Sequence, residues 1–203
     1  MKRFVTSDYH LGEDRMAIMQ RPFKNQKDMI DLIVERHNEV VGPDDIVYNL
    51  GDVCYQKYPE FLSEMSRFNG THILLRGNHD RVFTDEQLLL YFKEVIPEGD
   101  VLELEVGDIK CALTHYPSRA VLERFNLVGH IHSAWRFQLN MFNVGVDANH
   151  FTPQNIDEVV PFVFKAITEA YDKDVWAAYS QVNMTYIGSR GKKGSYFAGE
   201  KNV

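Results

Sequence analysis

The chain has 203 residues, a formal net charge of −7, and 44% hydrophobic and 25% charged residues, which suits one globular domain with a sizeable core. The acidic balance argues against a broad surface for long nucleic acid or for anionic membranes. Two cysteines make no disulfide framework, and no apolar stretch approaches the length of a membrane span. Residues 1–7 are too short for a signal peptide, so we expect a cytoplasmic protein.

The first part of the sequence alternates short apolar runs with helical patterns. Strands are predicted near residues 4–5, 46–50 and 72–76, and helices near residues 29–41 and 61–65. Gly42-Pro43 ends the first helix and Asn69-Gly70 ends the second. This alternation of strand and helix indicates an α/β protein.

The second part is richer in strands. Residues 101–106 and 109–114 flank the turn Gly107-Asp108 and predict an antiparallel hairpin. Further strands are predicted at 126–128 and within 137–146, and a helix at 156–170. We expect residues 1–187 to form a single domain and the glycine- and lysine-bearing residues 188–203 to form a flexible tail.

Five short motifs follow predicted strands and carry histidine, aspartate or asparagine. They are Asp8-Tyr9-His10, Gly51-Asp52, Gly77-Asn78-His79-Asp80, Thr114-His115-Tyr116-Pro117 and Gly129-His130-Ile131-His132. Ligands of open α/β sheets bind where strands end, so these motifs should meet in space. These side chains are the ligand types that hold two divalent cations, and a two-metal site serves in-line displacement at phosphorus.

Local geometry supports this interpretation for some motifs more than for others. The glycines at 51, 77 and 129 allow sharp turns that aim the next side chain into a cleft. Asp8 and His10 would share one face of an extended segment. Taken alone, an Asp-x-His triplet or a Gly-Asp pair is more often an ordinary loop, whereas two histidines spaced as in Gly129-His130-Ile131-His132 are unusual outside metal sites.

The motif set resembles the calcineurin-like metallophosphoesterase superfamily, and more narrowly its small bacterial and phage phosphohydrolases. Other matching segments are Arg21-Pro22-Phe23, Val41-Gly42-Pro43-Asp44-Asp45, His115-Tyr116-Pro117 with Arg119, and Val144-Gly145-Val146-Asp147. The resemblance covers about residues 3–160. It implies a four-layer αββα sandwich, in which two packed mixed β-sheets are flanked by helices.

The resemblance also implies a role for each motif position. Asp8, His10 and His132 would hold one divalent ion, whereas Asn78, His115 and His130 would hold the other. Asp52 would bridge the two ions, and a hydroxide shared between them would attack phosphorus in line. This ligand chemistry accepts Mn, Fe, Zn, Co or Ni, with Mn favoured. His79, oriented by Asp80, would donate a proton to the leaving group or to a phosphoryl oxygen.

Three further residues are candidates for substrate binding. Arg119, Arg21 and Tyr116 lie near ligand motifs, and an arginine near a cleft can fork onto a phosphate. Each arginine can equally pin a loop by pairing with an acidic neighbour, and Tyr116 can simply pack beside the site.

The leading hypothesis is a metal-dependent phosphodiesterase or phosphomonoesterase. The alternatives are a nuclease acting on short nucleic acids and a protein-binding scaffold that has lost catalysis. The expected partner is a phosphoester whose identity the sequence does not specify. The sequence also does not specify whether monoesters or diesters are preferred, or the oligomeric state.

Overall fold

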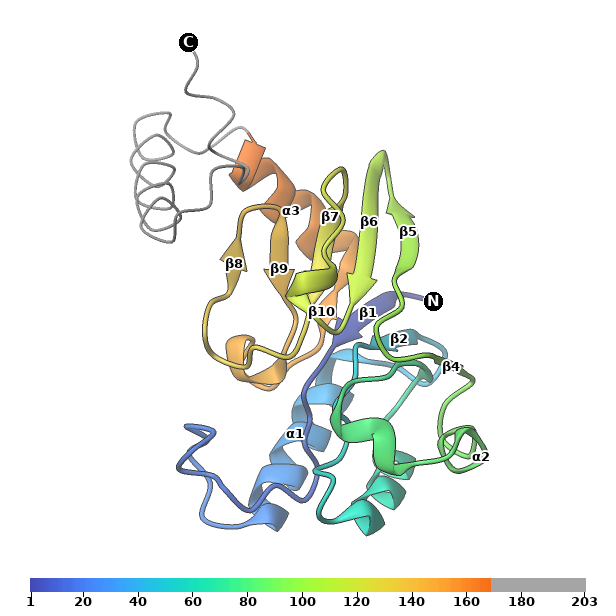
Figure 1. Cartoon of the computed structure of the whole chain (residues 1–203), viewed down its shortest axis with the longest axis vertical. Helices are drawn as coiled ribbons and strands as arrows, with labels where there is room; N and C mark the ends of the chain where they lie inside the picture. Colours follow the sequence, from blue (N-terminus) through green and yellow to red (C-terminus); the bar gives the residue numbers. More distant parts are fainter. Residues whose placement is uncertain (169–203) are drawn as a thin grey trace, which may run out of the picture. The chain divides into compact units, whose positions relative to one another are not determined.

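Two five-stranded sheets form the centre of the computed structural model, which describes residues 1–168 (Figure 1). The strand order of the first sheet is β10-β1-β2-β3-β4. These strands are β1 (Arg3–Thr6), β2 (Ile46–Asn49), β3 (Thr71–Leu75), β4 (Glu94–Ile96) and β10 (Gln154–Asn155). Strands β1 to β4 run parallel, and β10 pairs antiparallel with β1.

The strand order of the second sheet is β5-β6-β7-β9-β8. These strands are β5 (Leu102–Val106), β6 (Ile109–Thr114), β7 (Phe125–Val128), β8 (Phe137–Gln138) and β9 (Met141–Asn143). Strands β6, β7 and β9 are parallel, whereas β5 and β8 form antiparallel edges. The predicted hairpin is therefore the β5–β6 pair, in which Val106 faces Ile109.

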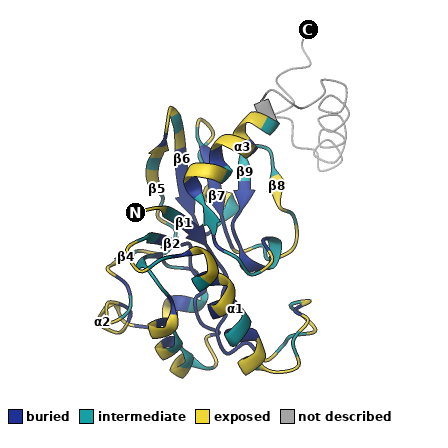
Figure 2. Ribbon diagram, turned by 180° about the vertical axis from the view of Figure 1, so that it is seen from behind, coloured by how far each residue is buried: buried dark blue, intermediate teal, exposed yellow. Residues whose placement is uncertain are grey.

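Helices cover the two sheets. Helix α1 (Gln26–Val40) begins at Asn25, whose side chain accepts a hydrogen bond from the backbone N–H of Asp28. Its apolar stripe, which includes Met29 and Ile33, packs in the core with Leu74 of β3. Helix α3 (Ile156–Thr168) lies against the second sheet, and its outer side chains are exposed (Figure 2). The predicted four-layer αββα arrangement is confirmed.

The second predicted helix differs in type from a regular α-helix. Residues Pro59–Arg67 form the 3₁₀ helix η1. The hydroxyl groups of Ser63 and Ser66 donate to the backbone oxygens of Glu60 and Ser63, at 3.0 and 2.9 Å. Such side-chain bonds compete with the α-helical pattern and favour the tighter helix.

The remaining helices are single turns close to the motifs. They are η2 (His79–Val82), α2 (Asp85–Leu88), η3 (Pro117–Arg119) and η4 (Val146–Ala148). No helix within residues 1–168 is long and apolar enough to cross a membrane. Residues Met1–Phe164 form one compact unit. The predicted boundary between residues 187 and 188, and the predicted end of the last helix at residue 170, lie outside the described residues.

The two sheets meet where β1 and β9 end. Ser7 and Gly145 form a parallel bridge, and the backbone N–H of Val146 donates to the carbonyl of Ser7 at 3.0 Å. Farther along the same segment, Leu11 bridges to Cys54. The loops that carry the motifs are therefore held at one common edge.

Candidate metal centre

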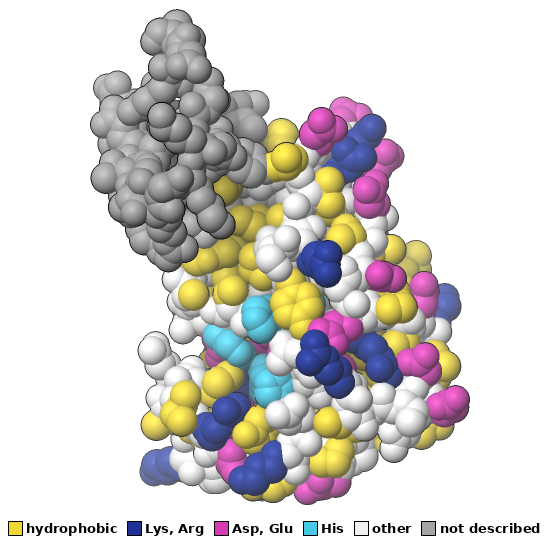
Figure 3. All heavy atoms as spheres, in the orientation of Figure 1, with side chains coloured by type: hydrophobic (Ala, Val, Ile, Leu, Met, Phe, Trp, Pro, Cys, Tyr) yellow, Lys and Arg dark blue, Asp and Glu magenta, His cyan; other side chains and the backbone are white. Residues whose placement is uncertain are grey.

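All five motifs lie just beyond the ends of strands, as predicted. Asp8 follows β1, Asp52 follows β2, Asn78 follows β3, His115 follows β6 and His130 follows β7. The side chains of Asp8, His10, Asp52 and His115 are buried, those of Asn78, His79 and His132 are half-buried, and His130 is exposed. Figure 3 shows histidine side chains gathered on one face, with basic side chains around them.

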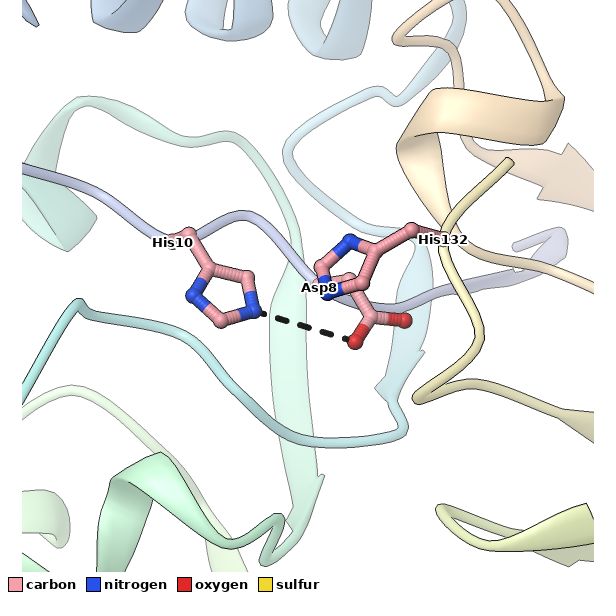
Figure 4. A group of neighbouring side chains, drawn as sticks. All are labelled: Asp8, His10 and His132. Carbon is pink, nitrogen blue, oxygen red and sulfur yellow. Dashed lines mark ion pairs between the residues drawn. The ribbon is translucent and has the colours of Figure 1, made fainter. Parts of the chain in front are cut away.

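One ligand group consists of Asp8, His10 and His132 (Figure 4), whose candidate ligand atoms all lie within 4.8 Å of one another. The His10 Nε2 atom is 3.9 Å from Asp8 Oδ1. His132 Nδ1 lies 2.8 Å from Asp147 Oδ2, so the Nδ1–H donates to this carboxylate. This contact leaves Nε2 of His132 free as a ligand atom.

A second ligand group contains Asp52, His115 and His130. His115 Nδ1 donates to the carbonyl oxygen of Leu50 at 2.6 Å, which leaves its Nε2 as the ligand atom. This Nε2 is 3.4 Å from Asn78 Oδ1, so Asn78 lies beside the same group.

Asp52 lies between these two groups and forms a third candidate group with His10 and His79. Its Oδ2 atom is 3.5 Å from His10 Nε2 and also 3.5 Å from His115 Nε2. Its other oxygen, Oδ1, accepts the backbone N–H of His79 at 2.8 Å. One carboxylate is thus shared by the two sets of ligands, and a backbone hydrogen bond fixes its orientation.

The unsatisfied polar atoms of this centre suit a metal ion. Both ring nitrogens of His10 are buried, and neither has a hydrogen-bond partner among residues 1–168. Buried polar atoms in proteins nearly always find a partner, so this pair needs an explanation. Imidazole nitrogens with carboxylate and amide oxygens are common ligands of divalent transition metals.

The electrostatics of the centre favour positive charge. Burial acts to raise the pKa of Asp52, but the nearby imidazole rings of His10 and His115, each 3.5 Å from its Oδ2, outweigh this effect and lower the pKa. Burial acts to lower the pKa of His115, but the contact with Asp52 raises it to about 9. The negative charge of the buried carboxylates thus favours nearby positive charge, which either protonated histidines or bound divalent cations can supply.

The backbone at the ligand positions is unusual. Asp8, His10, Asp52, His130 and His132 all have positive φ, with values from 48° to 72°. The expectation that Asp8 and His10 share a face of an extended segment is therefore wrong, since left-handed turns bring them together instead. Left-handed backbone at non-glycine residues is costly, and it concentrates at functional sites.

The three motif glycines have two different explanations. Gly51 has φ of +98°, so it provides the sharp turn that was predicted. A Cβ on Gly77 would lie 2.2 Å from Asp52 Oδ1, and a Cβ on Gly129 would lie 2.1 Å from Ser7 Oγ. Gly77 and Gly129 are therefore needed for close approach between loops rather than for a left-handed turn.

Asp80 does not contact His79 in the way that was predicted. Its Oδ2 accepts the backbone N–H groups of Asp52 and Gly77, both at 2.8 Å, and its Oδ1 accepts that of Val53 at 3.0 Å. Burial and the charge of Asp52 raise the pKa of Asp80 to about 7, although the three amide bonds act in the opposite direction. Asp80 is thus a positioning residue that joins the Asp52 loop to the Asn78 loop.

Arg21 is buried and fully engaged. Its guanidinium donates to both carboxylate oxygens of Asp147, at 2.8 and 3.0 Å, and to the backbone oxygens of Asp8 and Tyr9. Its side chain has 0% exposure, which leaves no face for a phosphate. The predicted substrate contact of Arg21 is therefore wrong, and the other possibility, pairing with an acidic neighbour, is what the structure shows. Arg21 links the backbone of Asp8 and Tyr9 to Asp147, which also contacts His132.

Arg119 is exposed, and Tyr116 is half-buried beside the centre. The Tyr116 ring lies 4.8 Å from the His115 ring and 4.9 Å from the His130 ring, between centroids. The Tyr116 hydroxyl donates to Glu98. The structure thus brings Tyr116 to two of the predicted ligands, and the substrate contacts predicted for Tyr116 and Arg119 stay predictions.

Two groups beside the centre were not predicted. Buried Glu13 accepts hydrogen bonds from the Nε and Nη2 of Arg15, whose guanidinium carbon lies 4.4 Å from the centre of the Tyr55 ring. Arg81 pairs with Glu98. Glu13, Arg15 and Glu98 lie outside the motifs, and Arg81 directly follows the Gly77-Asn78-His79-Asp80 motif in η2. Only the fold brings these pairs together, so the sequence carried no signal for the contacts.

Fold and ligand geometry together define a metallophosphoesterase, and the comparisons with known proteins agree. The family model of the calcineurin-like phosphoesterases matches residues 1–143, and the chain belongs to this family. Its members are hydrolases of phosphoesters that use divalent metal ions, so the predicted superfamily is confirmed.

Two similar proteins come from Methanocaldococcus jannaschii and Aquifex aeolicus. An uncharacterized protein of Methanocaldococcus jannaschii, MJ1445, is 25% identical over 177 residues, which cover 81% of this chain and 92% of that protein. The crystal structure of AQ665, a protein of unknown function from Aquifex aeolicus, has a TM-score of 0.59 at 22% identity. The match covers 79% of this chain and 98% of that one. The second similarity supports the fold alone.

Proposed function

We propose that this protein is a phosphohydrolase with a dinuclear metal centre that cleaves phosphodiesters or phosphomonoesters. The seven proposed ligands are Asp8, His10, Asp52, Asn78, His115, His130 and His132. The observation that carries the proposal is the position of Asp52 Oδ2, at 3.5 Å from the Nε2 atoms of both His10 and His115. Two bound ions would lower the pKa of a bound water molecule toward neutrality and would neutralise the negative charge of the phosphoryl oxygens.

His79 is the proposed proton donor. Its ring packs edge-on against the ring of His10, with centroids 4.7 Å apart, and the side chain is half-buried. Its Nδ1 is buried and has no hydrogen-bond partner among residues 1–168, so Nε2 is the nitrogen that can reach a substrate. A proton on Nε2 would pass to the leaving-group oxygen or stabilise a phosphoryl oxygen.

No side-chain nucleophile is needed for this reaction. Cys54 lies two residues beyond Asp52, but it is buried, and burial raises the pKa of its thiol well above the ordinary value. A buried neutral thiol is a poor nucleophile. We therefore expect no covalent phosphoenzyme.

We further propose that the substrate is a phosphoester of limited size and that the protein acts in the cytoplasm. The net charge of −7 disfavours long nucleic acid, although a short oligonucleotide is compatible with the site. A scaffold that has lost catalysis would show no turnover even when both metal positions are filled.

Chelation and reconstitution test the proposal. The protein is stripped of metal, dialysed and assayed on p-nitrophenyl phosphate and bis(p-nitrophenyl) phosphate with and without added Mn²⁺. We expect hydrolysis of at least one ester to disappear with the metal and to return with Mn²⁺. Undiminished hydrolysis after complete metal removal would contradict the proposal, and absence of turnover at full metal loading would favour the scaffold alternative.

A further inference from the structure

One rim of the centre carries an aromatic ring and three charged side chains. The ring is that of Tyr116, which is in contact with the rings of His115 and His130. The Tyr116 hydroxyl donates to Glu98, which fixes the ring beside the proposed metal ligands. Glu98 is therefore linked through Tyr116 to the proposed ligands His115 and His130.

Two arginines lie at this rim, and one of them pairs with Glu98. Arg81 donates to Glu98 from Nε and Nη2, each at 2.5 Å, and this two-point contact fixes the direction of its guanidinium. Arg119 donates its backbone N–H to the carbonyl of Tyr116 at 2.9 Å. Its guanidinium lies over Gly99, since a Cβ built there would be 3.9 Å from Nη2.

The charges of this rim do not cancel. Arg119 is exposed, and no carboxylate within residues 1–168 forms an ion pair with it. Arg81 is paired with Glu98, whereas the Arg119 guanidinium has no ion-pair partner among the described residues, so it leaves an unpaired positive charge at this rim although the chain as a whole carries −7. Figure 3 shows basic and acidic side chains side by side near the histidines on this face.

The other charged group beside the centre is balanced. Arg15 pairs with Glu13, and its neighbour Asp14 pairs with Lys57 at 2.8 Å. The surplus of positive charge is therefore found at the Tyr116 rim and not near Tyr55.

We infer that Arg119 and Arg81, next to Tyr116, form a second anion-binding position, so that preferred substrates carry a second phosphate group beyond the one that is cleaved. This inference rests on the proposed function and names its substrate class. A guanidinium binds a phosphate through two parallel hydrogen bonds, and charge-assisted bonds of this kind are among the strongest in proteins. Glu98 holds Arg81 in place, and the Tyr116 ring separates this position from the metal ligands.

Matched pairs of small phosphoesters test the inference. The probes are straight-chain alkanediol monophosphates and bisphosphates with three to six carbons, which differ only in the second phosphate. Their binding to the Mn²⁺-loaded protein is measured by calorimetry at fixed free Mn²⁺, and their kcat/KM by phosphate release. At one or more chain lengths we expect the bisphosphate to bind about tenfold more tightly, as one charge-assisted contact predicts.

Substitutions locate the effect. Arg119→Gln and Arg81→Gln should each bring the bisphosphate-to-monophosphate ratio toward one. Arg36→Gln is the matched control, because Arg36 is a half-exposed residue of α1 paired with Glu39, and the ratio should be kept. Equal affinity for both probes, including no detectable binding of either, would overturn the inference, as would a ratio that survives both rim substitutions. Tight bisphosphate binding without turnover of any ester would instead contradict the proposed function and leave the rim assignment standing.

Discussion

His79 contacts the site in two ways, through its backbone and through its side chain. The backbone N–H of His79 orients the shared carboxylate, while the His79 side chain lies beside His10. The two functions of His79 can therefore be separated, since a substitution at this position removes the ring and keeps the backbone contact.

His79→Ala should leave both metal ions bound and lower turnover by about 10²–10⁴-fold, as expected for loss of a positioned proton donor. The loss should be larger for an alkyl ester than for a nitrophenyl ester, because a poor leaving group depends more on the proton. The measurement compares the two esters in parallel with metal analysis. Equal losses on both esters would indicate action on the phosphoryl oxygens, and unchanged rates would remove His79 from the mechanism.

The sequence predicted that the motifs carrying the proposed metal ligands come together, but it did not predict their supporting contacts. Asp80 follows His79 directly, and the family resemblance implied that Asp80 orients the His79 side chain. The 3₁₀ turn η2 instead directs the carboxylate of Asp80 to the backbone of Gly77 and of the Asp52 loop. Such contacts depend on how separate strands are placed, which no local pattern records.

The loops beyond β2, β3, β6 and β7 approach one another closely enough to exclude side chains. Gly77 is the tightest position in the Asn78 loop, where an added Cβ would also come within 2.8 Å of His115 Cε1. The close approach of the proposed ligands Asp52 and His115 to this loop therefore requires a residue without a side chain at position 77.

Gly77→Ala should lower metal affinity at least tenfold, and the free energy of unfolding should fall by about 1–3 kcal/mol, as for other overpacked sites. Metal titration and urea unfolding measure the two effects. Gly42→Ala is the control, because the nearest atom to its new Cβ is Asp45 Oδ2 at 3.4 Å, an ordinary contact. Wild-type metal affinity in Gly77→Ala would contradict the role given to this close approach.

Helix α1 and strand β3 share a buried pair of histidines that supports the Asp8 loop. His37 Nε2–H and His72 Nε2–H both donate to the carbonyl of Asn69, and the hydroxyl of Tyr9 donates to His37 Nδ1. Burial lowers the pKa of His37 to about 3 and that of His72 to about 4. These contacts give both histidines a structural role.

These pKa values predict a pH-dependent stability. The folded pKa of His72 is below its ordinary value of 6.5, so the unfolded chain binds more protons at acidic pH. The contribution of His72 to the free energy of unfolding is therefore fully present above about pH 6.5 and is lost as the pH falls toward about 4. Between pH 7 and pH 5 this loss amounts to about 1–2 kcal/mol. In urea unfolding of the metal-free protein, His72→Gln should show a smaller loss between these pH values than wild type does. An identical loss would contradict the assignment.

At the scale of the whole molecule, two mixed sheets bring their strand ends together at the Ser7–Gly145 bridge. The regular strands and α1 could be predicted because apolar periodicity and turn residues mark them. Strands β4 and β10 could not, because short segments such as Gln154–Asn155 become strands only by pairing with a neighbour. The left-handed backbone of Asp8 and His10 was likewise missed, since no local pattern records the backbone hydrogen bonds of these residues to Gly51 and Asp52 in the loop after β2.

All of the proposed ligands precede residue 133, and we propose that the domain needed for catalysis ends by residue 187. Truncation after Ile187 should leave metal content and turnover of a small ester nearly unchanged, because no motif residue is removed. Metal analysis and steady-state kinetics on the folded, truncated protein measure this. A large loss of turnover would mean that residues 188–203 contribute to the site.

The central claim is that one carboxylate is shared by two metal positions. Elemental analysis of wild type and Asp52→Ala, each reconstituted with Mn²⁺ and freed of excess metal, tests it most directly. We expect two ions per chain in wild type. In the variant we expect either no bound ion or one ion with nearly all turnover lost, because Asp52 Oδ2 faces both His10 and His115. Two tightly held ions in Asp52→Ala would contradict the account.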